Sequence, residues 1–262
     1  MKSIDIFKPL KGKTAIISGS SSGIGAAIAL ELAIRGANIV INYPYPQFKE
    51  EAQNTLTSIL RETNGIEGII VEADIGTIDG PKNLIEQTVS KFGKIHILVN
   101  NAALAINKPL RDHNLKDWDI LVNLNGRGTF LLTQNALPHL ANPSRIVNIC
   151  SASSRGSPPL QSIYAGTKGM VDSFTKVWAK ELPKEYGCTV NSVSPGPTKT
   201  KGFEAAGEEA MMVLQPTIDK TPVAARMGNP AEIAYAVASL ADDKACWING
   251  VHLHVNGGLY IE

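Results

Sequence analysis

The chain has 262 residues, of which 44% are hydrophobic and 19% are charged, and its formal net charge is +1. This composition is typical of one globular domain, and the near-zero charge gives no electrostatic support for a nucleic-acid partner. Cys150, Cys188 and Cys246 lie far apart, which predicts neither a disulfide framework nor a metal site. No apolar run approaches the ~20 residues of a membrane span, and residues 1–13 lack a signal-peptide pattern. We therefore expect a cytoplasmic protein with no membrane partner.

Short segments rich in Ile and Val recur along the chain and predict strands buried on both faces. The segments between them have helical spacing, as in Ile24, Ile28 and Leu32. This alternation predicts an α/β fold, with a doubly wound parallel sheet of about seven strands and helices on both faces. The predicted strands are residues 14–18, 38–42, 68–73, 95–100, 145–150, 188–193 and 251–255.

One stretch, residues 194–229, interrupts this alternation with several prolines and glycines. It is too long for an ordinary connection in a compact domain, so we expect a substrate lid at about 197–228. Its apolar side chains indicate an adaptable wall for a substrate. The same side chains are equally suited to packing the segment onto the sheet. They are Phe203, Met211, Met212, Val213 and Leu214.

A glycine cluster follows the first strand directly. In "SGSSSGIG", Gly19, Gly23 and Gly25 precede a predicted helix, which is the context that a dinucleotide site requires. Glycine lets the backbone approach a pyrophosphate, and the helix N-terminus offers unpaired N–H groups to it. The loop alone is also compatible with a plain Gly/Ser turn, but its setting favours nucleotide binding.

Tyr164 and Lys168 are four residues apart in "YAGTK", a spacing that places two side chains on one face of a helix. A lysine ammonium roughly 4–5 Å from the phenol would favour phenolate by up to ~4 kcal/mol at an effective dielectric of ~20. That corresponds to lowering the tyrosine pKa by up to ~3 units. The pair therefore indicates a tuned general acid and base.

Several motifs in order, from about residue 10 to the C-terminus, resemble the short-chain dehydrogenase/reductase family. They are Gly19-x-x-x-Gly23-x-Gly25, "NNAA" at 100–103, Tyr164-x-x-x-Lys168, "SPGP" at 194–197 and "VNGG" at 255–258. The resemblance implies a single Rossmann-type NAD(P)-binding domain over residues 1–262. It also implies that Tyr164 exchanges a proton with the substrate oxygen while a hydride moves, and that Lys168 also binds the nicotinamide ribose.

The resemblance implies two further catalytic residues. Ser151, thirteen positions before Tyr164, matches the serine that polarises the substrate oxygen, although Ser153 and Ser154 are close by. Asn125 matches the asparagine that holds a water near the lysine, with a structural helix kink as the alternative. At position 103, Ala replaces the usual glycine, which would matter if the backbone there needed a positive φ.

The resemblance also implies the dinucleotide contacts. Asn42 and Tyr43 end the second strand without a carboxylate, which favours NADP(H) over NAD(H), with Lys49 as a possible counter-charge. Asp74 either lies near the adenine or caps a turn. The full set is Gly19, Ser21, Ser22, Gly23, Ile24, Gly25, Asn42, Tyr43, Asp74, Ile75, Asn101, Ala102, Tyr164, Lys168, Pro195, Gly196, Thr198 and Thr200.

The Asn-Tyr strand ending resembles fungal hydroxynaphthalene and polyketide-type ketoreductases. We therefore expect an NADPH-dependent carbonyl reductase acting on a bulky, polycyclic or polyketide-type ketone. The alternatives are a 3-oxoacyl-carrier-protein reductase and a non-catalytic NADP(H)-binding sensor or scaffold. Predicted helices near 115–137 and 162–182 carry surplus apolar residues, and the family pairs these helices across a two-fold axis. We therefore expect a homotetramer or homodimer.

Overall fold

The computed structural model describes residues 8–204 and 207–261. Seven parallel strands form one sheet in the order β3-β2-β1-β4-β5-β6-β7. This confirms the predicted Rossmann-type architecture, in which the strand order reverses between β1 and β4. The strands are β1 Thr14–Ile17, β2 Asn38–Tyr43, β3 Gly68–Glu72, β4 Ile95–Asn100, β5 Leu140–Ile149, β6 Cys188–Pro195 and β7 His252–Val255.

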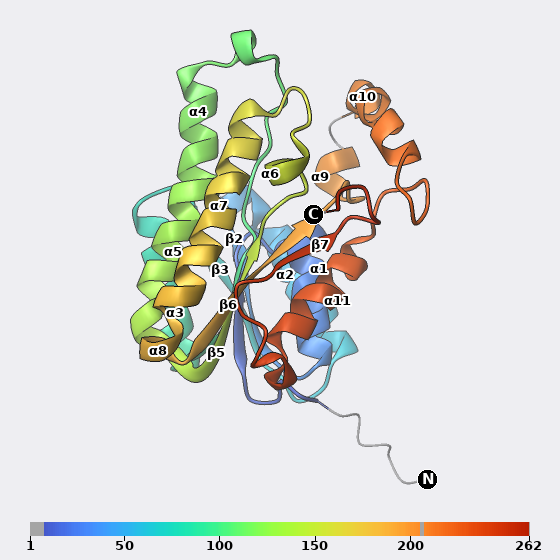
Figure 1. Cartoon of the computed structure of the whole chain (residues 1–262). Coiled ribbons are helices and arrows are strands. Elements are labelled where there is room, and N and C mark those ends of the chain that lie inside the picture. Colours follow the sequence, from blue (N-terminus) through green and yellow to red (C-terminus); the bar gives the residue numbers. More distant parts are fainter. Residues whose placement is uncertain (1–7, 205–206, 262) are drawn as a thin grey trace, which may run out of the picture.

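Helices cover both faces of this sheet (Figure 1). The helices α1 (Gly23–Ile34), α2 (Lys49–Glu62) and α11 (Pro230–Ala241) share one apolar core with the strands. On the other face α3 (Asp79–Phe92), α5 (Thr129–Ala136) and α7 (Ser162–Glu181) share a second core. Neighbouring strand residues alternate between the two, which explains why the strand segments are apolar throughout.

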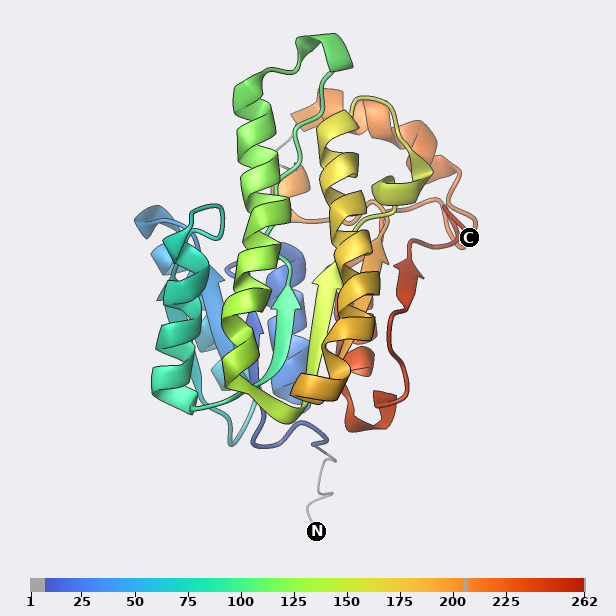
Figure 2. The ribbon, with the colours of Figure 1, turned by 60° about the vertical axis from the view of Figure 1, so that its left-hand side comes forward.

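The helix predicted near 115–137 has three parts. α4 (Leu115–Leu121) leads into a π-helical turn, Val122–Gly128, and then into α5. Figure 2 shows these parts as one long rod beside α7, in front of the sheet. The shorter helices are α6 Ser153–Gly156, α8 Pro183–Tyr186, α9 Lys201–Glu204 and α10 Gly207–Asp219. Short 3-10 turns occupy Pro46–Phe48, Leu110–Asp112, Leu137–His139 and Asp243–Ala245.

β5 begins five residues earlier than the sequence predicted. Residues 140–144, "LANPS", have neither the apolar run nor the β-branched composition of a strand. Leu140 pairs with Ile95, and the register then shifts so that Arg145 pairs with Ile97. Tertiary pairing, which the local composition does not show, therefore extends this strand.

The carboxyl ends of the central strands meet at one edge of the sheet. The glycine loop follows β1, the "NNAA" segment begins at the end of β4, and Ser151 follows β5. Helices α9 and α10 of the predicted lid lie at the same end of the molecule (Figure 1). In open parallel sheets this edge is where ligands bind. Within the described residues, no helix is both long and apolar enough to cross a membrane.

Candidate active site

The glycine loop has the backbone that its composition predicts. Gly19 and Gly23 have φ values of +61° and +60°, in the left-handed region that favours glycine. A Cβ atom on Gly25 would lie 2.4 Å from the carbonyl oxygen of Gly19, so this position needs glycine for close packing. Helix α1 begins at Gly23, and its N-cap residue Ser22 makes no side-chain capping bond. The loop is thus an open cradle at a helix N-terminus, which suits a pyrophosphate.

The segment after β4 braces this loop from the other side. The Ser18 hydroxyl accepts the backbone N–H groups of Asn101 and Ala102, at 2.9 and 3.0 Å. In return, the Asn101 side-chain amide donates to the carbonyls of Ser18 and Gly19, at 2.8 and 2.9 Å. Ala103 fits without a glycine-like backbone, since the non-glycine residues with positive φ in the described chain are Ser157 and Leu160.

The Ser151 hydroxyl lies next to the Tyr164 phenol and acts on its pKa as a hydrogen-bond partner. Ser151 is held in turn by its neighbours. The Ser153 backbone N–H donates to the Ser151 hydroxyl at 3.1 Å, and the Ser154 hydroxyl donates to the Ser151 carbonyl at 2.7 Å. Of the three serines, the structure therefore brings Ser151 to the tyrosine and uses the other two to orient it.

Lys168 lies beneath this pair and is 3% exposed. Its ammonium donates to the carbonyl of Ile149 at 2.8 Å and lies 6.0 Å from the centre of the Tyr164 ring. Burial, which penalises the charged form, lowers the pKa of Lys168 to about 8. The lysine is thus held at the end of β5, within reach of both the phenol and the dinucleotide edge of the sheet.

The family model described as Enoyl-(Acyl carrier protein) reductase matches residues 19–260. The chain is 38% identical over 253 residues to the short-chain dehydrogenase/reductase FrzI of Cladobotryum sp., covering 95% of this chain and 96% of that protein. It is 36% identical over 269 residues to versicolorin reductase 1 of Dothistroma septosporum, covering 98% and 99%. It is 35% identical over 251 residues to the 3-oxoacyl-[acyl-carrier-protein] reductase FabG of Staphylococcus aureus, covering 95% and 98%.

Solved structures agree with these relatives. A short-chain dehydrogenase from Burkholderia cenocepacia J2315 in complex with NADP has a TM-score of 0.87 at 32% identity, covering 96% of this chain and 99% of that one. A blue fluorescent protein from a metagenomic library in complex with NADPH has a TM-score of 0.88 at 30% identity, covering 97% and 100%. The chain belongs to the short-chain dehydrogenase/reductase family. It is accordingly an NAD(P)-dependent oxidoreductase.

From the sequence we expected Lys168 to lower the pKa of Tyr164 in this short-chain dehydrogenase/reductase. In the structure the pKa of Tyr164 is raised instead. Burial raises the pKa of Tyr164, and the hydrogen bond from Ser151 lowers it by a smaller amount. Lys168 is not among the groups that shift the pKa of Tyr164, and its ammonium donates to the Ile149 carbonyl instead. A phenol that keeps its proton at neutral pH is a donor ready for carbonyl reduction.

Asn125 lies in the π-helical turn and uses its whole amide for structure. Its oxygen accepts the Leu104 N–H at 3.0 Å, while its nitrogen donates to the Leu104 carbonyl at 2.9 Å and to Thr167 Oγ1 at 3.0 Å. The helix is therefore π-helical at Asn125, while the kink given as the alternative and water binding near Lys168 both stay predictions. Sequence reasoning missed Thr167, although its place between Tyr164 and Lys168 marks it as a neighbour of the site.

Asn42 lies differently from the prediction. Asn42 is 1% exposed; its amide oxygen accepts the Gly19 N–H at 2.9 Å and its nitrogen donates to the Ala73 carbonyl at 2.9 Å. Tyr43 packs in the core. The inward orientation of Asn42 does not fit its predicted contact with the dinucleotide, whereas the hydroxyl of Tyr43 lies beside Glu72 and its predicted contact stays a prediction. Asn42 instead ties the glycine loop to the ends of β2 and β3.

The remaining predicted cofactor residues surround the same edge. Asp74 does cap a turn, accepting the Gly76 N–H at 2.8 Å, and it also accepts the Tyr45 hydroxyl at 2.8 Å. No sequence pattern pointed to Tyr45 as a partner of Asp74. Thr200 lies 3.5 Å from where a Cβ of Gly23 would stand. Ser21, Ile75, Pro195 and Thr198 are buried, whereas Ile24, Ala102 and Gly196 are partly exposed.

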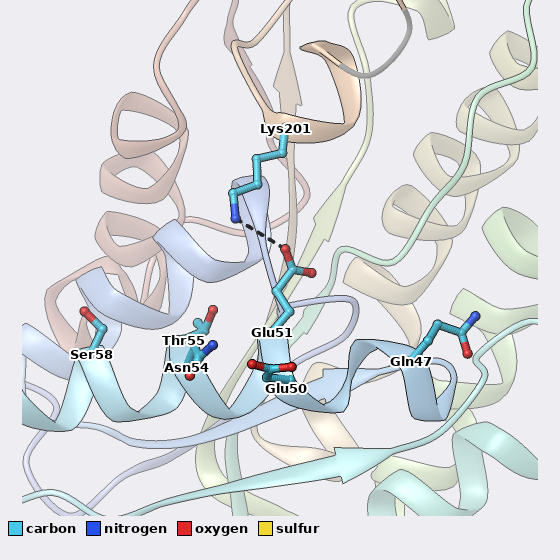
Figure 3. Close-up of a pocket in the computed structure, with 7 residues that line it drawn as sticks. All are labelled: Gln47, Glu50, Glu51, Asn54, Thr55, Ser58 and Lys201. Atoms are coloured by element: carbon cyan, nitrogen blue, oxygen red, sulfur yellow. Dashed lines mark hydrogen bonds and ion pairs between the residues drawn. The ribbon is translucent and has the colours of Figure 1, made fainter.

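A polar groove separates α2 from the start of the predicted lid (Figure 3). Lys201 of α9 reaches across it to Glu51 of α2, with 3.5 Å between Nζ and Oε1. Helix α2 also contacts the glycine loop, because the Thr55 hydroxyl donates to the Ser21 carbonyl at 2.6 Å. The groove is lined by Gln47, Glu50, Glu51, Asn54, Thr55, Ser58 and Lys201.

Proposed function

We propose that this enzyme is an NADPH-dependent reductase of a ketone on a bulky, polycyclic or polyketide-type substrate. The joined side chains of Ser151 and Tyr164, with Lys168 beneath them, carry the proposal. A bound reduced nicotinamide would supply the hydride. Tyr164 donates its proton to the carbonyl oxygen, and Ser151 donates a hydrogen bond that polarises the same oxygen.

The lid and the similarity to versicolorin reductase 1 support a bulky substrate. Leu104, Met212 and Val223 are exposed on the segments around the site, so apolar surface is available to a large ring system. Met211 and Val213 also belong to the predicted apolar wall, but their side chains are not among those that the structure describes. Ketones of increasing ring count should therefore be reduced with rising kcat/KM until the site is filled.

Two observations support NADP(H) over NAD(H). The two similar structures carry NADP and NADPH, and β2 ends without the carboxylate that would repel a 2′-phosphate. Asn42→Asp is a poor test, because a new carboxylate would face the Ala73 carbonyl in the core. Ser22→Arg is better, since Ser22 is partly exposed on the glycine loop.

We expect wild-type kcat/KM to be higher with NADPH than with NADH. Ser22→Arg should raise the NADPH preference by about tenfold, through a close pair with the 2′-phosphate. Ser22→Gln is the uncharged control and should leave the preference near that of the wild type. Equal use of both cofactors by the wild type, or no response to the arginine, would contradict the NADP(H) assignment.

The similarity to FabG of Staphylococcus aureus favours a second candidate, reduction of a 3-oxoacyl group on a carrier protein. Such a partner is acidic and would need basic surface near the lid. Lys201 and Arg226 lie there, but each is paired with a local carboxylate, Glu51 or Glu232. A non-catalytic sensor is the third candidate, and the complete set of catalytic side chains argues against it.

A cofactor-oxidation assay separates these three. We expect NADPH consumption with a free polycyclic ketone and little with a 3-oxoacyl thioester. Faster turnover of the carrier-bound thioester would favour the second candidate. Binding of NADPH without turnover of any carbonyl substrate would favour the third.

We also propose a homotetramer or homodimer that uses the outer face of α4, α5 and α7. Trp118, Phe130, Met170 and Val177 are exposed there, with exposed fractions of 53%, 39%, 36% and 54%. Some of the apolar residues that these helices carry in excess are instead buried within the chain. They are Leu121, Leu132, Val171 and Trp178. Light scattering of the purified protein should give a multiple of the 28.0 kDa chain mass.

A further inference from the structure

A carboxylate on α7, beyond the catalytic residues, joins three elements around the active site. Asp172 lies one helical turn after Lys168 and is 9% exposed. It accepts from the Arg155 guanidinium at 2.9 and 3.1 Å, from Lys176 Nζ at 3.0 Å, and from His252 Nδ1 at 2.7 Å. Helix α6, helix α7 and strand β7 therefore meet at this one side chain.

The charges around Asp172 keep it ionised. Burial raises the pKa of this carboxyl, but hydrogen bonds from Lys176 and Arg155 and the nearby His252 outweigh it, so the pKa lies below its ordinary value. Burial lowers the pKa of His252 by more than Asp172 raises it, and burial also lowers the pKa of His254 on the same strand. At neutral pH the cluster is thus a carboxylate between two cations and neutral histidines.

Arg155 connects this cluster to the Ser151 turn. It lies in α6, a single helical turn whose first residue, Ser153, donates its backbone N–H to the Ser151 hydroxyl. The chain that follows α6 contains Ser157 and Leu160, with φ values of +49° and +69°. A non-glycine residue rarely adopts this conformation, so local preferences do not hold the segment after α6 in place. The Ser151 turn before it has hydrogen bonds of its own, and the ion pair from Arg155 attaches the turn and this segment to α7.

We propose that the Arg155–Asp172 ion pair, backed by His252, fixes the Ser151 turn against α7 and so keeps the Ser151 hydroxyl on the Tyr164 phenol. This inference rests on the proposed carbonyl reduction. Arg155 and Asp172 are positioning residues, because they act through Ser151. Small displacements of a group that polarises the reacting oxygen are costly to the rate.

Two substitutions test the rate. Arg155→Gln and Asp172→Asn should each lower kcat at saturating NADPH and ketone by about ten- to a hundredfold. Each should leave the dissociation constant for NADPH close to that of the wild type. Arg155→Lys keeps the cation and should recover much of the rate. Lys176→Ala is the matched control: it removes a contact to the same carboxylate from a half-exposed side chain, so kcat should stay within about twofold of wild type.

A second measurement needs neither substrate nor cofactor, so it still decides the proposal if the assigned reaction is wrong. The ultraviolet difference between each protein and its Tyr164→Phe partner reports ionisation of the Tyr164 phenol. Because the Ser151 hydrogen bond lowers that pKa, Arg155→Gln and Asp172→Asn should raise it, while Lys176→Ala should not.

The contrary result is a loss of melting temperature in both variants with wild-type kcat and unchanged Tyr164 ionisation. That result would make the ion pair a structural attachment only and would overturn the proposal. If Asp172→Asn does not fold, Arg155→Gln decides alone, since it leaves Asp172 paired with Lys176 and His252.

Discussion

The floor and the lid of the proposed active site are built in opposite ways. On the floor, buried amides and hydroxyls such as those of Ser18, Asn42 and Asn125 bond the loops to one another. At the lid, the charged contacts are exposed ion pairs, Lys201–Glu51 and Arg226–Glu232. Breaking a buried hydrogen bond leaves a polar group without water, whereas an exposed ion pair exchanges easily with solvent. Floor substitutions should therefore abolish function, and lid substitutions should adjust it.

The largest effect should come from Tyr164→Phe on the floor. Removing the hydroxyl should lower kcat by about 10²–10⁴-fold, because it removes the general acid. The dissociation constant for NADPH should change little, since the ring remains in place. Steady-state kinetics and a fluorescence binding titration check the two parts. Tyr235→Phe, on an exposed tyrosine of α11, is the control and should match the wild type. A Tyr164→Phe rate above about a tenth of wild type would mean another proton donor.

Paired glycine substitutions compare the two regions directly. Gly25→Ala should weaken NADPH binding by about tenfold or more, because its Cβ would lie 2.4 Å from the Gly19 carbonyl and 2.7 Å from the Asn101 amide. Gly202→Ala in the lid helix α9 has nothing within 4 Å of the added Cβ, so NADPH affinity should be unchanged. Calorimetric titration measures both. Equal losses in the two variants would erase the distinction between floor and lid.

The pH dependence tests the buried lysine of the floor. As pH rises through about 8, Lys168 loses its proton in the folded protein, so kcat/KM for reduction should fall by up to about tenfold per unit. Stability should change in the opposite direction. Between about 8 and the ordinary lysine pKa of 10.5, the unfolded chain binds more protons than the folded one, so this group favours folding increasingly as pH rises.

Lys168→Met isolates that contribution. At neutral pH the variant avoids burying a charge, and this stabilises its folded state relative to that of the wild type. The melting temperature of the wild type should therefore rise relative to that of the variant as pH increases from about 8 to 10.5. A constant difference across this window, together with a flat rate profile, would show that the folded lysine keeps an ordinary pKa.

The sequence predicted the parts of the fold that depend on local chemistry. The strands around Ile16, Val40 and Leu98 are apolar on both faces because each face packs under helices. The Tyr164–Lys168 spacing placed both residues on one helix because helical geometry fixes it. These features need no knowledge of distant contacts.

Features set by tertiary contacts were not predictable. Asn42 lies in a strand whose sequence is compatible with either orientation of the asparagine side chain. Only its hydrogen bonds with Gly19 and Ala73 show that it faces inward. The raised pKa of Tyr164 depends on burial, which the spacing to Lys168 does not reveal. Helix α10 contains Pro216, one of the prolines for which the sequence analysis predicted no helix within this lid segment.

The smallest expected effect belongs to the lid ion pair. Lys201→Ala should change KM for a bulky ketone by only about two- to threefold, because the lysine side chain is 78% exposed and its pair with Glu51 is screened by salt. The change should shrink as ionic strength rises, and Glu51→Ala should mimic it at low salt. A salt-independent loss of tenfold or more in Lys201→Ala alone would mean that Lys201 binds the dinucleotide or substrate directly. The lid would then supply a fixed binding group, and its ion pair would no longer differ in kind from the contacts of the floor.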